Sequence, residues 1–170
     1  MFGDPNTSLE TVPFEDAFVI RDDLRKPIND AVRSEMHKGA CYPYYGANGQ
    51  VDTINQYLMD CTALCLAEDC GAYGPGECSS YIVQGKCWVN NHAHVIIPKS
   101  NCDLSYANAF FRILDIRPYV SGSTRLKLTQ GKMKEIPVVL PSIDRQKEFA
   151  EFVEQSDKSK AVFQKRRRML

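Results

Sequence analysis

The residues best suited to chemistry lie in a basic stretch between residues 117 and 134. This stretch, RPYVSGSTRLKLTQGKMK, carries five cations and no acid. Cationic side chains neutralise DNA phosphates and release counterions, while hydroxyl groups and backbone amides donate hydrogen bonds to phosphate oxygens. The composition therefore predicts contacts with a DNA backbone, with a solvated loop as the alternative. The residues expected to make these contacts are Arg117, Ser123, Thr124, Arg125, Lys127 and Lys132.

Reading a DNA sequence also requires side chains that reach base edges. Arginine and lysine suit guanine, asparagine and glutamine suit adenine, and apolar groups contact the thymine methyl group. Two segments rich in turn residues, near residues 42–50 and 73–80, offer such groups. If these segments are only turns, their aromatic side chains pack on the core instead. The candidate reading residues are Tyr44, Tyr45, Asn48, Gln50, Tyr73, Ser79 and Ser80.

Two histidines, His92 and His94, lie two positions apart in the segment NNHAHV. On a strand they would point to the same side, which would suit a metal ion or a general base. No carboxylate lies near them in the sequence, so the two histidines have few candidate partners as metal ligands. We expect a structural role for this pair and no metal site.

The cysteines give the other possible metal site. Cys61, Cys65, Cys70 and Cys78 have spacings near those of zinc ligands, but paired C-x2-C motifs are absent. Cys61 and Cys65 fall in an expected core strand, where the two side chains could not easily face one metal. The seven cysteines are therefore expected to be reduced, mostly as small core residues. A cysteine-based zinc or redox protein remains an alternative that a metal assay would test.

Motifs for catalysis are missing from the sequence. We find no glycine-rich loop for S-adenosylmethionine, no Asn-Pro-Pro-aromatic motif, no G-x-x-x-x-G-K-[ST] phosphate loop and no nuclease-like cluster of carboxylates and lysine. The chain is expected to be non-catalytic and to need no cofactor.

Short apolar segments separated by turns must position these residues. Strands are predicted at Phe18–Ile20, Ala63–Ala67, Ser80–Val83, Cys87–Val89 and His94–Ile97, and a helix with one apolar stripe at Leu104–Leu114. The segment CYPYYGANGQ is expected to be a tight loop, because it contains Pro43, Gly46, Asn48 and Gly49. These elements indicate an α+β fold, a compact β-rich domain with short helices.

Composition and charge limit the classes of protein to which this chain can belong. The 170 residues are enough for one core, and the net charge is zero, but residues 1–116 carry −7 and residues 117–170 carry +7. Such asymmetry suggests that one region faces a nucleic acid or an acidic partner. No stretch approaches the roughly 20 apolar residues of a membrane span, and the start lacks a signal-peptide pattern. We therefore expect a cytoplasmic protein.

The C-terminal section differs in character from the rest. After Pro141, Ser142 offers an N-cap, and nothing from Ile143 to Leu170 breaks a helix. Apolar residues recur with a period near 3.5, which is typical of a helix that pairs with another helix. The expected pairing or subunit contacts are Phe149, Phe152, Val153 and Phe163. A pure assembly module, which pairs helices without binding DNA, is a second alternative.

Three segments in order resemble the specificity subunit of type I restriction-modification systems. They are YPYYGANG at Tyr42–Gly49, WVNNHAHVIIP at Trp88–Pro98, and SGSTRLKLTQGKMKEIPVVLPSIDRQKEFAEFVEQSD at Ser121–Asp157. The resemblance implies that residues 1–140 form one DNA target recognition domain and residues 141–170 a spacer helix suited to coiled-coil pairing. It also implies that Asn and His side chains in the second segment hold turns by hydrogen bonds.

The resemblance carries expectations about function and partners. The complete subunit of this family has two recognition domains and two helices, so this chain is expected to be a half-length subunit or a fragment. It would bind double-stranded DNA at one half of a bipartite site in a bacterial or archaeal cell. A separate methyltransferase subunit and, through it, a restriction motor subunit would be its partners, and a homodimer could form through the C-terminal helix.

Overall fold

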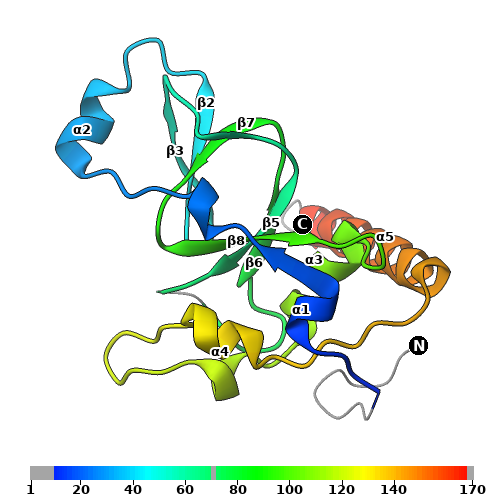
Figure 1. The fold of residues 1–170 in the computed structure, drawn as a ribbon. Coiled ribbons are helices and arrows are strands. Elements are labelled where there is room, and N and C mark those ends of the chain that lie inside the picture. The colour runs from blue at the N-terminus through cyan, green and yellow to red at the C-terminus, as the bar shows by residue number, and fades with distance from the viewer. Residues whose placement is uncertain (1–9, 70–71, 168–170) are drawn as a thin grey trace.

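The fold combines two small sheets with short helices and one long helix (Figure 1). It is a computed structural model that describes residues 10–69 and 72–167, and of residues 160–167 only the backbone. Because mostly antiparallel sheets occur together with segregated helices, the predicted α+β class is confirmed.

The first sheet lies at the centre of the domain. Its strands are all antiparallel, in the order β1 (Phe18–Ile20), β8 (Ala93–Pro98), β5 (Ala63–Ala67) and β6 (Ser80–Val83). Every residue of β5 is buried. Leu64 and Leu66 pack into the main core, whereas Cys65 packs into a second cluster. An uninterrupted apolar run forms such a strand because both of its faces are covered.

The second sheet has the order β3 (Gly49–Ile54), β2 (Tyr42–Gly46), β7 (Lys86–Val89) and β4 (Met59–Asp60). Only β2 and β7 run parallel, through the pairs Tyr44–Trp88 and Tyr45–Val89. The second cluster joins the two sheets, because it contains Cys65 from β5 as well as Cys87 and Val89 from β7.

Helices cover the other face of the first sheet. The main core takes aromatic residues from α1 (Phe14–Ala17) and α3 (Leu104–Ile113), with ring centroids of Phe14 and Phe111 6.4 Å apart. The remaining short elements are η1 (Asp22–Leu24), α2 (Asp30–Glu35), η2 (Arg117–Tyr119) and α4 (Gln130–Lys134). None of the helices in the described ranges combines the length and apolarity of a membrane span.

The predicted strands and the α3 helix are confirmed to within one residue at each end. The tight loop predicted around residues 41–50 is wrong, because residues 42–54 form the β2–β3 hairpin. Pro43 is tolerated in β2 because it pairs with Thr53 and lies beyond the short ladder with β7. Cys61 was also expected in a core strand, but it lies between β4 and β5.

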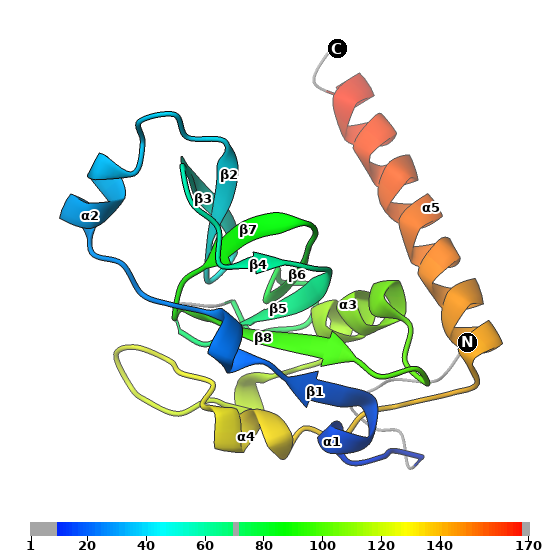
Figure 2. The same ribbon diagram turned by 45° about the horizontal axis from the view of Figure 1, so that its top comes forward.

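The long helix α5 (Ile143–Arg167) begins where the sequence predicts. Its 25 residues make it about 37 Å long at about 1.5 Å per residue. The first turns rest on α3, where Phe149 meets Tyr106 edge-on at 5.8 Å between ring centroids. In Figure 2 its C-terminal half extends away from the rest of the chain. One face of α5 is therefore tied to the domain, while the far end lies clear of it.

Gln146 is the polar anchor of α5, and it is fully buried. Its side-chain oxygen accepts from the Asp103 N–H at 2.7 Å, and its amide donates to the carbonyls of Asn101 and Pro141 at 2.9 and 2.8 Å. The side chain therefore satisfies three backbone groups at the junction of α3 and α5.

Replacing Gln146 with leucine should lower the free energy of unfolding by about 2–4 kcal/mol, because three buried backbone groups lose their partner. Urea unfolding followed by circular dichroism measures this change. Gln155→Leu, at an exposed position of the same helix, is the control and should change stability by less than about 0.5 kcal/mol. Equal effects of both substitutions would show that Gln146 does not anchor the helix.

Candidate nucleic-acid interface

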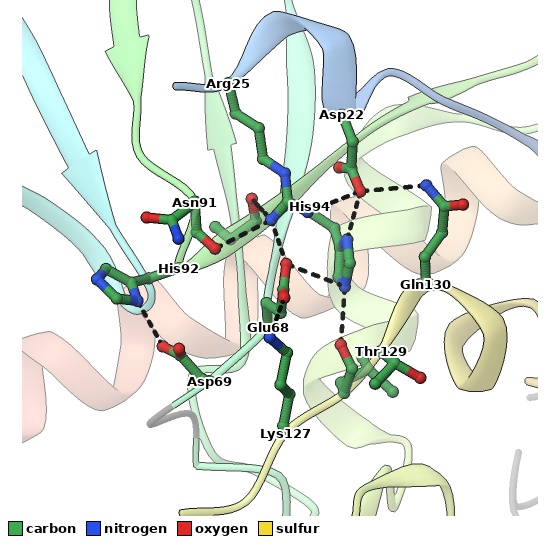
Figure 3. A network of polar contacts seen from close by, with 12 residues as sticks. Asp22, Arg25, Glu68, Asp69, Asn91, His92, His94, Lys127, Thr129 and Gln130 are labelled. Atoms are coloured by element: carbon green, nitrogen blue, oxygen red, sulfur yellow. Dashed lines mark hydrogen bonds and ion pairs between the residues drawn. The ribbon is translucent and has the colours of Figure 1, made fainter. Parts of the chain in front are cut away.

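A half-buried polar cluster lies at the end of β5, where η1, β8 and the segment before α4 meet (Figure 3). His94, which is 1% exposed, is at its centre. Its Nδ1 lies 2.7 Å from a carboxylate oxygen of Asp22, and its Nε2 lies 2.8 Å from the Leu128 carbonyl. Both neighbours are hydrogen-bond acceptors, so each ring nitrogen of His94 faces an oxygen. His94 thereby ties the first sheet to the segment that carries the basic stretch.

Two carboxylates of the cluster are held in their ionised form. Burial opposes ionisation of Asp22, but the hydrogen bond and charge of His94, the Val95 N–H and Arg25 outweigh it, so the pKa of Asp22 is lowered. Burial likewise opposes ionisation of Glu68, and the hydrogen bonds from Lys127 and Arg25 outweigh it, so its pKa is lowered too. The cluster is therefore a set of compensated charges at neutral pH.

The acids of the cluster bind the cations of the basic stretch. Glu68 pairs with Arg25 and accepts from Lys127 Nζ at 2.8 Å. Asp69, the next residue, pairs with Arg125 at 3.0 Å through one oxygen and with His92 at 2.7 Å through the other. Two consecutive residues at the end of one strand thus hold two cations of the predicted DNA-binding stretch.

The basic stretch forms a closed loop over residues 121–127. Two backbone hydrogen bonds, of 2.9 and 2.8 Å, join Ser121 and Lys127, and the Leu128 N–H donates to the Glu68 carbonyl at 2.7 Å. Gly122 has φ +101°, and a Cβ atom there would lie 2.3 Å from the Arg125 carbonyl oxygen, so the turn requires glycine. The loop exposes the predicted contacts Ser123, Thr124, Arg125 and Lys127.

The β2–β3 turn lies beside this cluster. The Asn90 N–H donates to the Tyr45 carbonyl at 3.0 Å, and the Asn90 side-chain oxygen accepts from the His92 N–H at 2.8 Å. A chain of contacts therefore runs from the hairpin, which carries the exposed Asn48, to His92, Asp69 and Arg125. These three segments, residues 46–50, 90–92 and 121–127, are what we call the candidate interface. Figure 2 shows the last of them on the side of the domain away from α5.

All five cations of the basic stretch have acidic partners in the described part of the chain. Arg117 binds Asp115 through two hydrogen bonds of 2.8 and 2.7 Å, which raises the pKa of Arg117. Lys132 pairs with Glu135 and Lys134 with Glu15, while Arg125 and Lys127 pair with Asp69 and Glu68 as above. The stretch has no acid in its own sequence, but the fold compensates its charge.

Four predicted reading residues do not reach the surface. The side chains lie in the core, with exposures of 1–4%, and form internal hydrogen bonds or core packing. Tyr73 donates to the Glu68 carbonyl at 2.9 Å, and Ser80 donates to the Asn108 side chain at 2.9 Å. A buried side chain cannot contact a duplex, so we remove from the interface Tyr44, Tyr73, Ser79 and Ser80.

The other predicted residues are more accessible. Tyr45 is partly buried and stacks on Tyr81 with 5.5 Å between ring centroids, and burial raises the pKa of Tyr45. Gln50 is exposed next to the β2–β3 turn. Arg117 and Lys132 are exposed on η2 and α4, which flank the closed loop.

The four residues predicted to contact another helix or subunit differ in their surroundings. Phe149 is partly buried and packs on Tyr106, so it joins α5 to its own domain. Val153 is half-buried and lines a groove of about 620 Å³ between α3 and α5. Phe152 is 62% exposed. The side chain of Phe163 lies outside the described residues.

The described cysteines are not gathered around a common point that could hold a metal ion. In residues 10–69 and 72–159, no three His, Cys, Asp or Glu side chains are placed to hold a metal ion; Cys70 lies outside these ranges. Burial raises the pKa of Cys65 to about 12 and that of Cys87 to about 11. These thiols are protonated near neutral pH, and the thiol form is a poor nucleophile and ligand.

Comparison with known proteins decides the family. The family model for the type I restriction modification DNA specificity domain matches residues 16–168. The chain belongs to this family. The predicted resemblance is therefore confirmed, because the match covers both sheets and the whole of α5.

Individual relatives agree with this assignment. A Haemophilus influenzae protein, whose name describes a type I restriction enzyme specificity subunit, is 28% identical over 151 residues, which is 87% of this chain and 37% of that protein. A chain from a structural study of complex assembly and conformational transition of the type I R-M system has a TM-score of 0.68 at 12% identity, covering 95% of this chain and 42% of that one. The type I restriction-modification S subunit from M. genitalium has a TM-score of 0.63 at 12% identity, covering 91% and 42%. The chain thus spans about two fifths of the length of these relatives.

Sequence reasoning missed the acids of the cluster. Asp22, Glu68 and Asp69 come from two distant segments, and no local pattern links them to His94 or to the basic stretch. The pairing of β5 with β8 places Leu66 opposite His94 and so brings Glu68 and Asp69 close, and a hydrogen bond from the Val95 N–H brings Asp22 to the same strand.

Replacing Asp22 with asparagine tests the cluster. We expect the free energy of unfolding near pH 7 to fall by about 2–3 kcal/mol, the contribution of charge-assisted hydrogen bonds. A carboxyl group whose pKa is lowered by folding stabilises the protein above its unfolded value, near 3.8, and loses this contribution as the pH falls through the folded value. Wild-type stability should therefore decline below about pH 4, and more steeply than that of the variant. Urea unfolding from neutral to acidic pH measures both effects.

The control for this experiment is Asp23→Asn, next in sequence but in an exposed pair with Arg21. Its effect should be much smaller, because water screens the pair. If the two variants had equal stability at every pH, the cluster would not be the stabilising element.

Proposed function

We propose that this chain reads one half of a bipartite DNA site for a type I restriction-modification enzyme and is itself non-catalytic. Residues 1–140 would be the target recognition domain, and residues 141–170 the spacer helix. Methylation and cleavage would belong to a separate methyltransferase subunit and, through it, to a restriction motor subunit. The complex would act in the cytoplasm of a bacterial or archaeal cell.

One observation carries this proposal beyond the family assignment. The candidate interface gathers an exposed amide-bearing turn and an exposed cationic loop on one side of the domain, away from α5. Cations and hydroxyl groups suit phosphates, whereas amides suit adenine edges. The arrangement provides both the positioning and the reading that sequence-specific binding needs.

The interface also suits a partner that performs the chemistry. Methyltransferases that act on a base extrude it from the duplex, which unstacks the DNA. A recognition domain fixed by backbone hydrogen bonds would hold the duplex while the target base enters the pocket of the methyltransferase subunit. The role of this chain would therefore be to position the DNA.

The helix α5 is proposed to pair with another spacer helix, either from a second copy or from another part of a longer subunit. Among the described side chains of α5, Phe152 is the most exposed large apolar one, and the backbone of the C-terminal half of the helix extends away from the domain.

Selection of randomised duplex DNA by the complex of this chain with its methyltransferase subunit tests the DNA-reading role. The wild-type complex should retain a short motif. Lys132→Met, at a predicted contact whose ion-pair partner Glu135 is also exposed, should weaken binding to all sequences and lower the slope of log affinity against log salt concentration by about one, as expected for a phosphate contact. Asn48→Ala should relax the preference at one position and leave the salt slope unchanged.

The control for charge is Arg145→Met, at an exposed position of α5 that pairs with Glu148, and it should change neither property. A complex that forms but retains no motif would reduce the chain to an assembly module.

Replacing Phe152 with aspartate should weaken association through α5, because a charge would be buried in an apolar helix interface. We expect at least a tenfold rise in the dissociation constant, measured by analytical ultracentrifugation of the chain, or of the chain with its methyltransferase subunit. Thr62→Asp adds the same charge at an exposed position of the domain and should have no effect. Unchanged association in the Phe152 variant would remove this face of α5 from the interface.

A further inference from the structure

Arg125 and Lys127 lie on the same closed loop but in different surroundings. Lys127 is at the base of the loop, where its backbone closes the pair with Ser121. Arg125 is nearer the tip, beside Leu126, which is 42% exposed. An exposed apolar side chain has little to gain from a phosphate backbone, but it suits the methyl groups and base edges in a groove. The surroundings of the tip would therefore suit a groove, whereas the base of the loop would suit the phosphate backbone.

The guanidinium of Arg125 is oriented by a chain of two contacts. Asp69 Oδ2 accepts from Arg125 Nη2 at 3.0 Å, and Asp69 Oδ1 is fixed by His92 Nδ1 at 2.7 Å. The Asp69 side chain is only 12% exposed, whereas that of Arg125 is 58% exposed. A nearly buried carboxylate, itself fixed by a histidine, thus holds a guanidinium that remains accessible to solvent.

The backbone of the loop does not depend on this ion pair. The two hydrogen bonds between Ser121 and Lys127, the bond from Leu128 to Glu68 and the glycine turn at Gly122 define its shape. Asp69 also keeps His92 as a partner if Arg125 turns to another acceptor. The pair of Asp69 with Arg125 is therefore available to orient a side chain, because it is not what folds the loop.

Arg117, in the same basic stretch, binds its acidic partner in a different geometry from Arg125. Its Nε and Nη2 atoms both donate to Asp115, at 2.8 and 2.7 Å. That bidentate pair uses the forked edge of the guanidinium, which is the edge that recognises guanine O6 and N7. Arg125 instead meets Asp69 through Nη2 at 3.0 Å, and His92 holds the other oxygen of that carboxylate.

We infer that Arg125 reads a guanine in the DNA half-site and that Asp69, held by His92, is the positioning residue that orients its guanidinium. Fixing the guanidinium before binding reduces the conformational entropy lost when both hydrogen bonds to a base form. A phosphate accepts a guanidinium over a wider range of orientations than a base edge does, so the gain from this alignment is larger for a base contact. This assignment rests on the proposed function, since it names which base one side chain of the interface reads.

The test is selection of randomised duplex DNA by the complex with the methyltransferase subunit, using three variants. Arg125→Lys keeps the charge but loses bidentate recognition. Asp69→Asn keeps the shape but loses the carboxylate that holds the guanidinium. Asp115→Asn is the matched control, because it removes the same charge from the acid that pairs with Arg117.

Arg125→Lys and Asp69→Asn should lower the preference for guanine at one and the same position of the motif by about tenfold. Preferences at the other positions should persist. Affinity for unrelated DNA should stay the same or rise in Asp69→Asn, because a negative charge is lost. Asp115→Asn should leave the guanine preference intact. A structural role of Asp69 would instead weaken the whole motif and lower the melting temperature.

Several outcomes would overturn the assignment. If Arg125→Lys leaves every base preference unchanged, Arg125 is a phosphate contact. If Arg125→Lys relaxes a guanine but Asp69→Asn does not, Asp69 has no positioning role. Arg125 is exposed on the loop, so its variant should fold even if the Asp69 variant does not, and the reading role remains testable. If the wild-type complex selects no motif, the proposed function itself fails, and this assignment fails with it.

Discussion

Buried charge compensation is the constraint on which the domain depends. Asp22 and Glu68 lie mostly out of water, and each needs cationic or N–H partners from other segments. His94 provides these links on one side and Lys127 on the other. Satisfying two carboxylates therefore requires that η1, the end of β5, β8 and the basic stretch meet at one point. Figure 3 shows this convergence. The shape of the candidate interface follows from the need to neutralise the cluster.

On the other side of the domain, the long helix α5 is likewise held by a buried polar side chain that satisfies groups from other segments. Gln146 satisfies three backbone groups where α3 and α5 meet, and the ring of Phe149 packs on Tyr106. An ion pair of 3.2 Å between Arg112 and Asp157 adds a third contact one turn beyond Val153. A helix fixed in this way has a defined direction relative to the sheets. That fixed direction is what a spacer needs if it is to hold one recognition surface at a set distance from another.

The sequence predicted the elements well where periodicity was local. An apolar run such as ALCLA, or the stripe of Leu104–Leu114, identifies its own element, because burial of that stripe dominates the local free energy. The β2–β3 hairpin was missed, because Pro43 and two glycines are typical loop residues, and the pairing of β2 with β3 is what makes strands of them. The residues of the interface were predicted only in part, because some of them depend on tertiary contacts that no local pattern shows. Cations in one stretch are visible in sequence, whereas burial of Tyr73 and the acids that face the cations depend on tertiary contacts.

The pairing of every cation in the basic stretch changes how the interface would attract DNA. Non-specific affinity comes mainly from uncompensated positive charge, since counterion release scales with the phosphates neutralised. Here each of the five cations already faces a carboxylate, as in the pairs of Lys132 with Glu135 and Lys134 with Glu15. Binding must therefore exchange one ion pair for another, with a small net gain in electrostatic free energy. A surface of this kind gains less from an arbitrary duplex than one with unpaired cations would, so base contacts count for more relative to charge. Charge compensation would thus favour selectivity over strength in the DNA-reading role proposed for the chain.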